Sequence, residues 1–391
     1  MINNTNGANG KKIVIITTIN YLPASPSLMN AIHLFMSADF CVDLICPKQG
    51  AWILPEYPNQ KINYHYVPKI KRFNIPGLDS LIHFLFTLYI CLFNRPLVII
   101  AVTQEGLLIA GPVAILFKLP LIYFSLEVRF VTGLRSRLRK ILEIFYFRFV
   151  KFTIIQDKVR AQSLLDSLEV KEMDVKKHDL ILVPNSGGIY APPAIKSNYL
   201  RLRWNIPDDK KVILYIGAFT DVSMVNELAR SAKNWDPTWT LIIHGWEDKK
   251  DYLDELKLAC DGKHIILSQD IVEQELLDKL VASADIGIAL YKPLDRNIYD
   301  MAQSSGKIWQ YLRCNLPVIT MDFPSLQEMM ADGRFGVCVH QPDEVEDAMK
   351  MIMNDYSRYQ AHAKAFYKLY GDFSVLFKPV LERISAFQRR K

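Results

Sequence analysis

Short apolar runs alternate with stretches of helical periodicity along almost the whole chain. Each run is uncharged or nearly so and is bounded by polar, glycine or proline residues, which is typical of strands buried in a parallel sheet. Most of the stretches between them place apolar residues at the spacing of one helix face. The alternation therefore predicts an α/β fold built of parallel layers. The predicted strands are residues 13–18, 42–46, 62–67, 97–102, 121–124, 152–156, 180–184, 212–216, 240–244, 265–267, 286–290, 318–320 and 337–339.

The alternation stops and restarts once, which predicts two Rossmann-like domains. Pro192 and Pro193 lie in the polar connection where the pattern is interrupted. Parallel sheets bind ligands at the carboxyl ends of their strands, so we expect the two domains to face each other across a cleft. The predicted parts are a disordered leader at residues 1–10, an N-terminal Rossmann-like domain at 11–190, a C-terminal Rossmann-like domain at 191–372, and a basic helix at 373–391 that packs back on the N-terminal domain.

The composition narrows the class of protein. Half of the 391 residues are hydrophobic, enough to bury two large cores. The leader has no apolar core of the kind that export signals carry. The six cysteines show no metal-ligand spacing, so we assign no metal site and expect a cytoplasmic location. Residues 80–94 are uncharged, but this run is shorter than a membrane-spanning helix, and we predict a buried helix.

Positive charge is concentrated in two places although the formal net charge is only +6. Residues 69–72 and 135–151 place lysines and arginines beside aromatic residues. Such a patch can bind anionic lipid headgroups, which would put the protein peripherally on the inner face of a membrane. An ordinary amphipathic helix with a solvated basic face explains the same pattern equally well. We expect no nucleic acid partner, because no recognised binding motif accompanies the charge.

The most informative segment is residues 303–320, QSSGKIWQYLRCNLPVIT. A small polar turn and a lysine precede a short amphipathic helix and a buried strand. The free backbone amides at a helix N-terminus, together with a cation, are the groups that bind phosphate. A lysine is unfavourable at this end of a helix unless a ligand supplies negative charge. We therefore predict a diphosphate site at Ser304, Ser305, Gly306 and Lys307, in which Lys307 stabilises the leaving diphosphate.

Residues that follow the other predicted strands of the second domain are further donor-binding candidates. Gly217 suits a tight turn close to a ligand. Trp246 offers a ring face to a base or a sugar. His244 can orient a phosphate or a sugar hydroxyl, although a histidine satisfied within the core is equally plausible. The predicted set is Gly217, Ala218, Phe219, His244, Gly245, Trp246 and Lys292.

The first domain supplies the candidate acceptor-binding residues Glu105, Glu127 and Arg129. Glu127 follows strand 121–124, where a carboxylate can bind an acceptor hydroxyl or act as a catalytic base. An ion pair with Arg129 is an equally good interpretation. Glu105 is a second acidic candidate. Its alternative role is to stabilise the first turn of a helix, where a negative charge is favourable.

Several segments together resemble the GT-B glycosyltransferases of group 1, close to the family 4 type. They are LYIGAF, LIIHGW, ADIGIALY and SSGKIWQYLRCNLPVIT in the second domain, and IIQDKVRAQSL and LVPNS in the first. Taken in order, these segments span nearly the whole chain. The resemblance implies transfer of a sugar from a nucleotide-diphosphate sugar to a lipid-linked or polysaccharide acceptor in cell-surface polysaccharide biosynthesis. It also implies that residues 11–190 form the acceptor domain and residues 191–372 the nucleotide-sugar donor domain. No metal or other cofactor is expected, since an Asp-x-Asp motif is missing and a lysine at a helix N-terminus takes its place.

The chain departs from the family pattern at three points. In the family, the site helix carries a glutamate that binds the ribose, eight residues after another acid. Gln310 and Ala302 occupy these positions here, so the retaining chemistry that the family implies stays open. Gln310 can still bind a ribose, and a solvated helix residue is its alternative. The loop after Gly217 lacks the family's cation, for which Lys292 or Arg296 can compensate. Two other functions therefore remain: a non-catalytic GT-B protein that binds a sugar nucleotide or a partner, and a nucleotide-sugar 2-epimerase.

Overall fold

A computed structural model describes most of the chain. The described residues are 11–20, 22, 25–48, 54, 61–68, 77–170, 178–188, 196–247, 250–270 and 272–387, without the side chains of residues 250 and 251. The predicted leader, the basic segment 69–72 and the predicted domain boundary at residue 190 lie outside this set.

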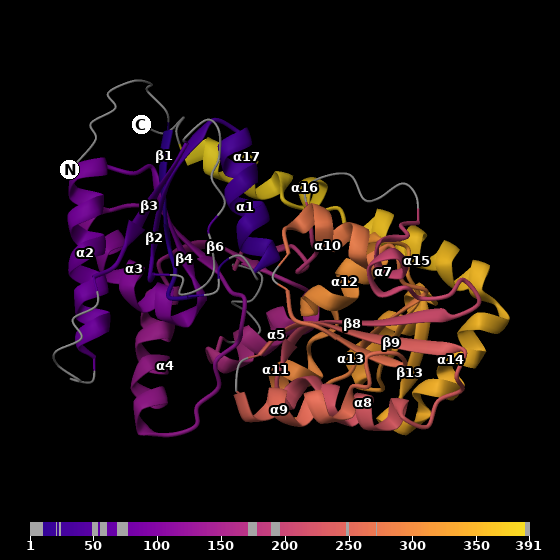
Figure 1. Cartoon of the computed structure of the whole chain (residues 1–391). Coiled ribbons are helices and arrows are strands. Elements are labelled where there is room, and N and C mark those ends of the chain that lie inside the picture. Colours follow the sequence, from indigo (N-terminus) through magenta and orange to yellow (C-terminus); the bar gives the residue numbers. More distant parts are fainter. Residues whose placement is uncertain are drawn as a thin grey trace. The chain divides into compact units, whose positions relative to one another are not determined.

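The chain divides into two compact units, each with one parallel sheet and its own helices (Figure 1). Unit 1 comprises residues 1–184 and 374–391, and unit 2 comprises residues 185–373. Each of the predicted strands is present. The two-domain α/β fold class is therefore confirmed.

Unit 1 contains a sheet of seven parallel strands in the order β3-β2-β1-β4-β5-β6-β7. The strands are β1 (Lys11–Ile16), β2 (Phe40–Cys46), β3 (Ile62–Tyr66), β4 (Val98–Val102), β5 (Leu121–Phe124), β6 (Val150–Ile155) and β7 (Leu180–Leu182). The helices are α1 (Pro26–Ser37), α2 (Leu78–Asn94), α3 (Thr103–Phe117), α4 (Leu134–Phe147), α5 (Lys158–Ser167), α16 (Phe373–Leu376) and α17 (Lys378–Ala386). The C-terminal segment is anchored in this unit, where Phe377 packs edge-on against Phe35 of α1 with ring centroids 5.3 Å apart.

Helices α2, α3 and α4 lie side by side, with α3 in contact with both of the others (Figure 1). The predicted helix over residues 80–94 is present as α2, but the expectation that it is buried was wrong. Only His83, Thr87, Ile90 and Cys91 of α2 are buried, while several of its leucines and aromatic residues are exposed. None of the described helices is long and apolar enough to cross a membrane.

Unit 2 contains a sheet of six parallel strands in the order β10-β9-β8-β11-β12-β13. The strands are β8 (Lys211–Phe219), β9 (Trp239–Glu247), β10 (Ile265–Ser268), β11 (Ile286–Ala289), β12 (Val318–Met321) and β13 (Gly336–Val339). The helices are α7 (Tyr199–Trp204), α8 (Val225–Ala232), α9 (Lys250–Ala259), α10 (Gln274–Val281), α11 (Arg296–Tyr299), α12 (Gly306–Arg313), α13 (Pro324–Gly333), α14 (Val345–Asn354) and α15 (Tyr356–Tyr370), with 3-10 turns η2 (Asp221–Ser223), η3 (Ala302–Ser304) and η4 (Pro342–Glu344). The strand order reverses between β8 and β11, the point at which such sheets bind nucleotides.

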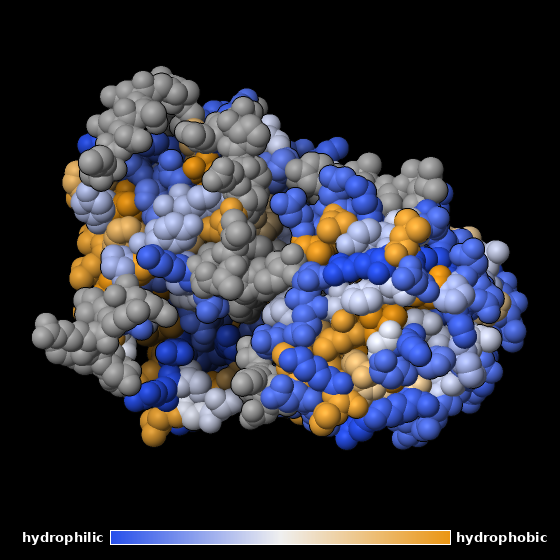
Figure 2. Space-filling view, viewed as in Figure 1, coloured by the Kyte–Doolittle hydropathy of each residue, from blue (hydrophilic) through white to orange (hydrophobic). Residues whose placement is uncertain are grey.

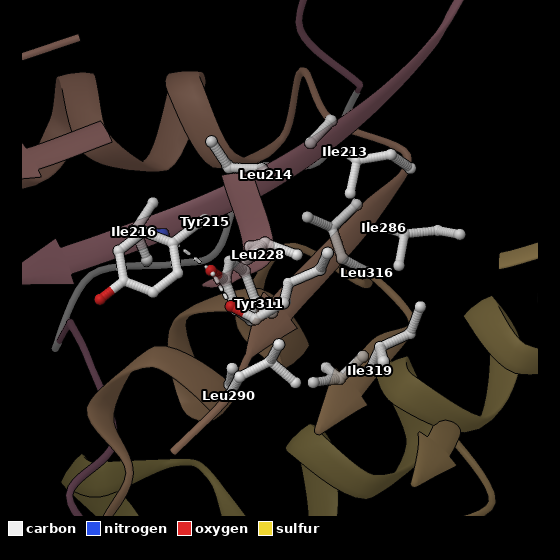
Figure 3. Close-up of a cluster of buried hydrophobic side chains, with 14 of the residues drawn as sticks. Ile213, Leu214, Tyr215, Ile216, Leu228, Ile286, Leu290, Tyr311, Leu316 and Ile319 are labelled. Carbon is white, nitrogen blue, oxygen red and sulfur yellow. Dashed lines mark hydrogen bonds between the residues drawn. The ribbon is translucent and has the colours of Figure 1, made fainter. Parts of the chain in front are cut away.

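The buried face of α12 ties together the two strands at this reversal. Tyr311 of α12 lies among buried aliphatic side chains, and its hydroxyl accepts a hydrogen bond from the Ile216 amide at 2.9 Å (Figure 3). The same hydroxyl donates to the Ile288 carbonyl at 3.0 Å. A Cβ at Gly287 would lie 2.3 Å from the Tyr311 ring, so the glycine makes room for it. α12 is therefore fixed against the carboxyl ends of β8 and β11.

Candidate functional site

The predicted phosphate-binding turn begins α12. η3 leads into Ser305, which caps the helix by accepting a hydrogen bond from the Ile308 amide at 3.4 Å. The Ser305 hydroxyl also shares a hydrogen bond of 2.5 Å with the hydroxyl of Tyr291, which follows β11. Gly306 is the first helical residue. The turn therefore presents a helix N-terminus at the point where the strand order reverses.

Lys307 lies between two tyrosine rings. Its ammonium is 4.4 Å from the ring centre of Tyr215 and 4.7 Å from that of Tyr291, and it donates to the Tyr215 hydroxyl at 3.0 Å. The Tyr215 hydroxyl donates in turn to the Ala218 carbonyl at 2.8 Å. Burial lowers the pKa of Lys307 from 10.5 to about 7. No carboxylate forms an ion pair with Lys307 in the part of the chain that the structure describes.

Two predicted glycines shape the strands beside this lysine. The sequence placed Gly217 and Gly245 in loops after their strands, whereas both lie within the extended ends of β8 and β9. Gly217 has a φ of +126°, which side chains rarely adopt, and a Cβ there would touch Lys307 at 3.4 Å. A Cβ at Gly245 would lie 1.8 Å from the Gly217 carbonyl oxygen. Both positions therefore require glycine, Gly217 because of its backbone conformation and Gly245 because of the close approach of β8 to β9.

The residues just before α12 carry one polar atom without an internal partner. The buried hydroxyl of Ser304 makes no hydrogen bond to any described residue. The backbone on either side is fixed, because the Asn185 side chain donates to the Ser304 carbonyl at 3.0 Å and the Asn185 amide donates to the Gln303 carbonyl at 2.9 Å. The Ser304 hydroxyl is thus held beside the turn with its hydrogen-bonding capacity unused among the described residues.

Gln310 lies inside a buried polar network. Its side-chain nitrogen donates to Asp278 at 2.6 Å, and its side-chain oxygen accepts from Gln274 at 3.2 Å. The alternative of a solvated helix residue was wrong, because Gln310 is only 4% exposed. Asp278 also binds Arg313 through an ion pair of 3.1 Å. Both polar atoms of Gln310 therefore have protein partners, and its predicted contact with a ribose remains a prediction.

Arg313 extends this network to the segment that opens unit 2. Its guanidinium donates to the carbonyls of Gly187 and Gly188 at 3.4 and 3.3 Å, and to the Tyr367 hydroxyl at 3.1 Å. Gly188 has a φ of +70°, and a Cβ there would lie 2.4 Å from the guanidinium. Helix α12 therefore carries the lysine at one end and anchors residues 187–188 at the other.

The other predicted donor residues occupy less open positions. Phe219 is fully buried, so its side chain belongs to the core and cannot contact a ligand, contrary to the prediction. His244 is buried and pairs through Nδ1 with the Ser268 hydroxyl at 3.0 Å, while burial lowers its pKa to about 4. His244 therefore corresponds to the alternative of a histidine satisfied in the core.

Lys292 and Trp246 complete the predicted donor set. The Lys292 ammonium forms a 2.6 Å ion pair with Glu227 of α8, and this hydrogen bond raises its pKa. Arg296 is likewise paired, with Asp300 at 3.2 Å. Trp246 is half-buried and lies opposite Ala218 in the register of β8 and β9. Lys307 is thus the cation at the turn. Lys292 and Arg296, which the sequence suggested as compensating cations, both form ion pairs with carboxylates.

The three predicted acceptor residues form one cluster in unit 1. Arg129 binds Glu127 at 3.2 Å and Glu105 at 3.6 Å, so it bridges the ends of β5 and β4. The Thr103 hydroxyl donates to Glu105 at 3.1 Å. Thr103 has a φ of +64°, an unfavourable conformation for a β-branched residue that is often retained at functional sites. The ion pair between Glu127 and Arg129, which was the alternative interpretation of Glu127, is therefore present. The carboxylates of Glu127 and Glu105 nevertheless remain partly exposed.

Sequence reasoning missed Tyr215, Asp278 and Thr103 as members of these clusters. A tyrosine inside the apolar run VILYI was a usable signal, because a buried hydroxyl needs a partner. Asp278 gave no such signal, since its pairing with Gln310 and Arg313 joins separate helices. The strain at Thr103 is a property of the backbone and is not visible in the sequence.

Comparison with known proteins agrees with this geometry. Residues 210–355 match the family "Glycosyl transferases group 1". A curated relative, the chitobiosyldiphosphodolichol beta-mannosyltransferase of Candida albicans, is 24% identical over 271 residues, or 61% of this chain. The match spans 56% of that relative's length.

Two solved structures match almost the whole chain in fold. HepE of Anabaena in complex with UDP and glucose has a TM-score of 0.70 at 15% identity, covering 96% of this chain and 100% of that one. Sucrose-phosphate synthase of Thermosynechococcus elongatus has a TM-score of 0.70 at 15% identity, covering 97% and 98%. The match of residues 210–355 to the group 1 glycosyltransferases and the GT-B fold of almost the whole chain confirm the resemblance that the sequence predicted.

Proposed function

We propose that the protein is a glycosyltransferase that moves a sugar from a nucleotide-diphosphate sugar to a lipid-linked or polysaccharide acceptor. Unit 2 binds the donor and unit 1 binds the acceptor. The proposed setting is the biosynthesis of a cell-surface polysaccharide, with peripheral contact to an anionic membrane through residues 135–151. The proposal includes no metal ion and no other cofactor.

The observation that carries the proposal is the cation at the N-terminus of α12. Lys307 is held between Tyr215 and Tyr291 without a carboxylate among its described contacts. A half-buried ammonium at the positive end of a helix is unfavourable by itself, and a diphosphate would supply the missing negative charge. As the sugar leaves, charge builds up on the diphosphate, and the ammonium and the free helix amides would stabilise it.

The turn offers several further groups to the donor. The Ser304 hydroxyl has no partner in the described structure, and the backbone at Gly217 and Ala218 is close to Lys307. We propose that these groups bind the phosphates and the sugar. The name of HepE's complex, with UDP and glucose, supports UDP and UDP-glucose as the first ligands to test.

The cluster of Glu105, Glu127 and Arg129 supports an acceptor site in unit 1. Its two carboxylates can accept hydrogen bonds from sugar hydroxyls, and Arg129 can bind a phosphate of a lipid-linked acceptor. Glu127 is our candidate for a base if the reaction inverts the sugar. The name of the Candida relative, a mannosyltransferase of a dolichol diphosphate glycan, supports a lipid-linked acceptor.

The test is a transfer assay with UDP-, GDP- and dTDP-sugars and a membrane extract as the source of acceptors. Wild-type protein is expected to transfer sugar or hydrolyse one donor. Lys307→Met is expected to lose both activities, and Lys279→Met, which removes a surface lysine paired with Glu275, is the matched control. Nucleotide binding without transfer or hydrolysis would favour the non-catalytic alternative, and release of a 2-epimer would favour the epimerase. The anomeric configuration of the product, read by NMR, tests the retention that we favour.

A further inference from the structure

Helix α4 buries a charged pair that the proposed chemistry does not use. Lys140 and Glu143 are 6% and 0% exposed, and their side chains form an ion pair of 2.7 Å. Removing two charges from water is unfavourable, and apolar side chains in their place are often as stable or more stable. The pair is therefore weak evidence for a role in stability, and the groups that it binds indicate what else it does.

Unit 1 does not lack apolar side chains that could fill this position. α4 itself exposes Leu138, Ile141 and Leu142. Figure 2 shows further hydrophobic residues on the surface over α2, at the left edge of unit 1. The charged pair is thus buried while apolar residues of the same helix are left in contact with solvent.

The carboxylate of Glu143 binds the ends of two neighbouring strands. One of its oxygens accepts a hydrogen bond from the Gln104 side chain at 2.6 Å, and the other accepts from the Tyr123 hydroxyl at 3.0 Å. Gln104 is the second residue after β4, and Tyr123 is the next-to-last residue of β5. The two strands are paired, with Val102 opposite Phe124. Glu143 therefore links the carboxyl ends of β4 and β5.

These two strand ends carry the proposed acceptor cluster. Glu105 follows Gln104 directly, and Glu127 and Arg129 lie in the loop after β5. The Arg129 guanidinium joins the two carboxylates, at 3.6 Å from Glu105 and 3.2 Å from Glu127. A shift of one strand end relative to the other would therefore change the distances within the cluster.

The backbone at the end of β4 is held in an unfavourable conformation. Thr103 has a φ of +64°, which a β-branched residue keeps where the surrounding contacts enforce it. The hydrogen bond from the next residue, Gln104, to the charged Glu143 is such a contact, because a bond to an ionised group is stronger than a neutral one. The Thr103 hydroxyl in turn donates to Glu105 at 3.1 Å. The buried carboxylate thus supports the conformation from which Thr103 reaches Glu105.

The loop after β5 has its own supports. The Ser125 carbonyl accepts a hydrogen bond from the Gln156 side chain, and the Leu126 carbonyl accepts one from the Arg160 guanidinium, both at 2.8 Å. These contacts fix the backbone just before Glu127. Both halves of the cluster are therefore held by buried polar groups behind it.

We infer that Glu143 is a positioning residue for the acceptor cluster. Through Gln104 and Tyr123 it sets the separation of the two strand ends, and it does not touch the acceptor itself. Lys140 compensates the buried charge of Glu143. This inference rests on the proposed function, because it takes the cluster of Glu105, Glu127 and Arg129 as the acceptor site.

The test measures transfer at saturating donor, with a membrane extract as the probe for the acceptor. Gln104→Met removes one contact of Glu143 and leaves its ion pair with Lys140 in place. A displacement of the cluster by about 1 Å should lower maximal transfer about 100-fold and raise the amount of extract needed for half-maximal transfer. The Kd for UDP and for GDP should not change, because the donor site lies in unit 2.

Two further variants separate positioning from stability. Gln104→Glu combined with Glu143→Gln keeps one carboxylate and one amide in contact, so it should transfer like wild type. Ser167→Ala removes a second hydrogen-bond partner of Lys140, at 3.2 Å, and is the matched control that should also transfer like wild type. Tyr123→Phe cuts the contact with β5 and replaces Gln104→Met if that variant does not fold.

Crystal structures of the ligand-free variants decide the geometry independently of activity. In Gln104→Met, Thr103 should leave its positive φ and Arg129 should lose its contact with Glu105. An unchanged cluster in this variant would overturn the inference, and so would an exchanged pair that folds but transfers as poorly as Gln104→Met. Parallel loss of transfer, nucleotide binding and thermal stability would also overturn it, in favour of a role in stability. Wild-type protein that transfers no sugar would refute the proposed function, whereas the variant structures would still decide whether the network positions the cluster.

Discussion

The pKa of Lys307 makes nucleotide binding depend on pH in a direction that can be measured. Burial holds this pKa at about 7 in the free protein. About three quarters of the molecules therefore carry the charged ammonium near pH 6.5, and about 3% carry it near pH 8.5. If a diphosphate binds the charged form, its apparent Kd should rise about 25-fold over this interval, since binding must first recharge the lysine.

Replacement of the ammonium tests the same contact. Lys307→Met keeps a long apolar side chain between the rings of Tyr215 and Tyr291 and removes the charge. A hydrogen bond to a charged group contributes about 1.5–3 kcal/mol, so the Kd for UDP or GDP near pH 6.5 should rise about 10- to 150-fold. The variant should also lose the dependence on pH.

The free energy of unfolding provides an independent readout. The pKa of Lys307 is about 7 in the folded protein and returns to the ordinary lysine value of 10.5 on unfolding, so the unfolded chain binds more protons between these values. Stability should therefore rise as pH increases through this window. The shift corresponds to at most about 5 kcal/mol. Lys307→Met should accordingly stabilise the ligand-free protein near pH 6.5 while it weakens nucleotide binding.

The assay is isothermal titration calorimetry at several pH values, in two buffers that differ in ionisation enthalpy. Wild-type protein near pH 8.5 should take up nearly one proton for each nucleotide bound, and Lys307→Met should take up none. Lys279→Met is the control for removal of a surface lysine. Affinity that is flat with pH in the wild type, or equal affinity in Lys307→Met, would refute the assignment of Lys307 to the phosphate.

Three further substitutions test other parts of the structure. Asp278→Asn leaves the buried guanidinium of Arg313 without its carboxylate, and urea unfolding should report a loss of about 3–5 kcal/mol. Gly245→Ala places a methyl group 1.8 Å from the Gly217 carbonyl and should leave unit 2 misfolded, visible as insoluble protein or lost near-UV dichroism. Glu127→Gln should reduce transfer at least about 100-fold with unchanged UDP affinity if Glu127 is the base, whereas a small effect would restrict it to acceptor binding.

The strands were predictable because short apolar runs bounded by polar, glycine or proline residues have few other stable arrangements in a chain of this length. The carboxyl ends of β8 and β9 could not be predicted, because the sequence gives Gly217 and Gly245 the appearance of turn residues. In the structure the same glycines allow the two strands to pair closely and extend past the point predicted. A glycine signals close approach of backbone, and the sequence alone does not tell whether the neighbour is a ligand or another strand.

Burial was less predictable than secondary structure. The apolar pattern of residues 80–94 predicts a helix correctly, but the run is apolar on every side and does not tell which side is buried. The buried residues of α2 include the polar His83 and Thr87 as well as the apolar Ile90 and Cys91. In α4 the ion pair of Lys140 with Glu143 is buried together with Phe147.

The position of Lys307 depends on contacts that local sequence could not reveal. α12 is a short helix, so displacement at its C-terminal end moves its N-terminal end as well. Arg313 holds that C-terminal end to Asp278 and to the carbonyls of Gly187 and Gly188. The network at the far end of the helix therefore keeps the lysine between its two rings. Loss of Asp278 should consequently weaken nucleotide binding as well as stability, although Asp278 touches neither Lys307 nor the turn in any described contact.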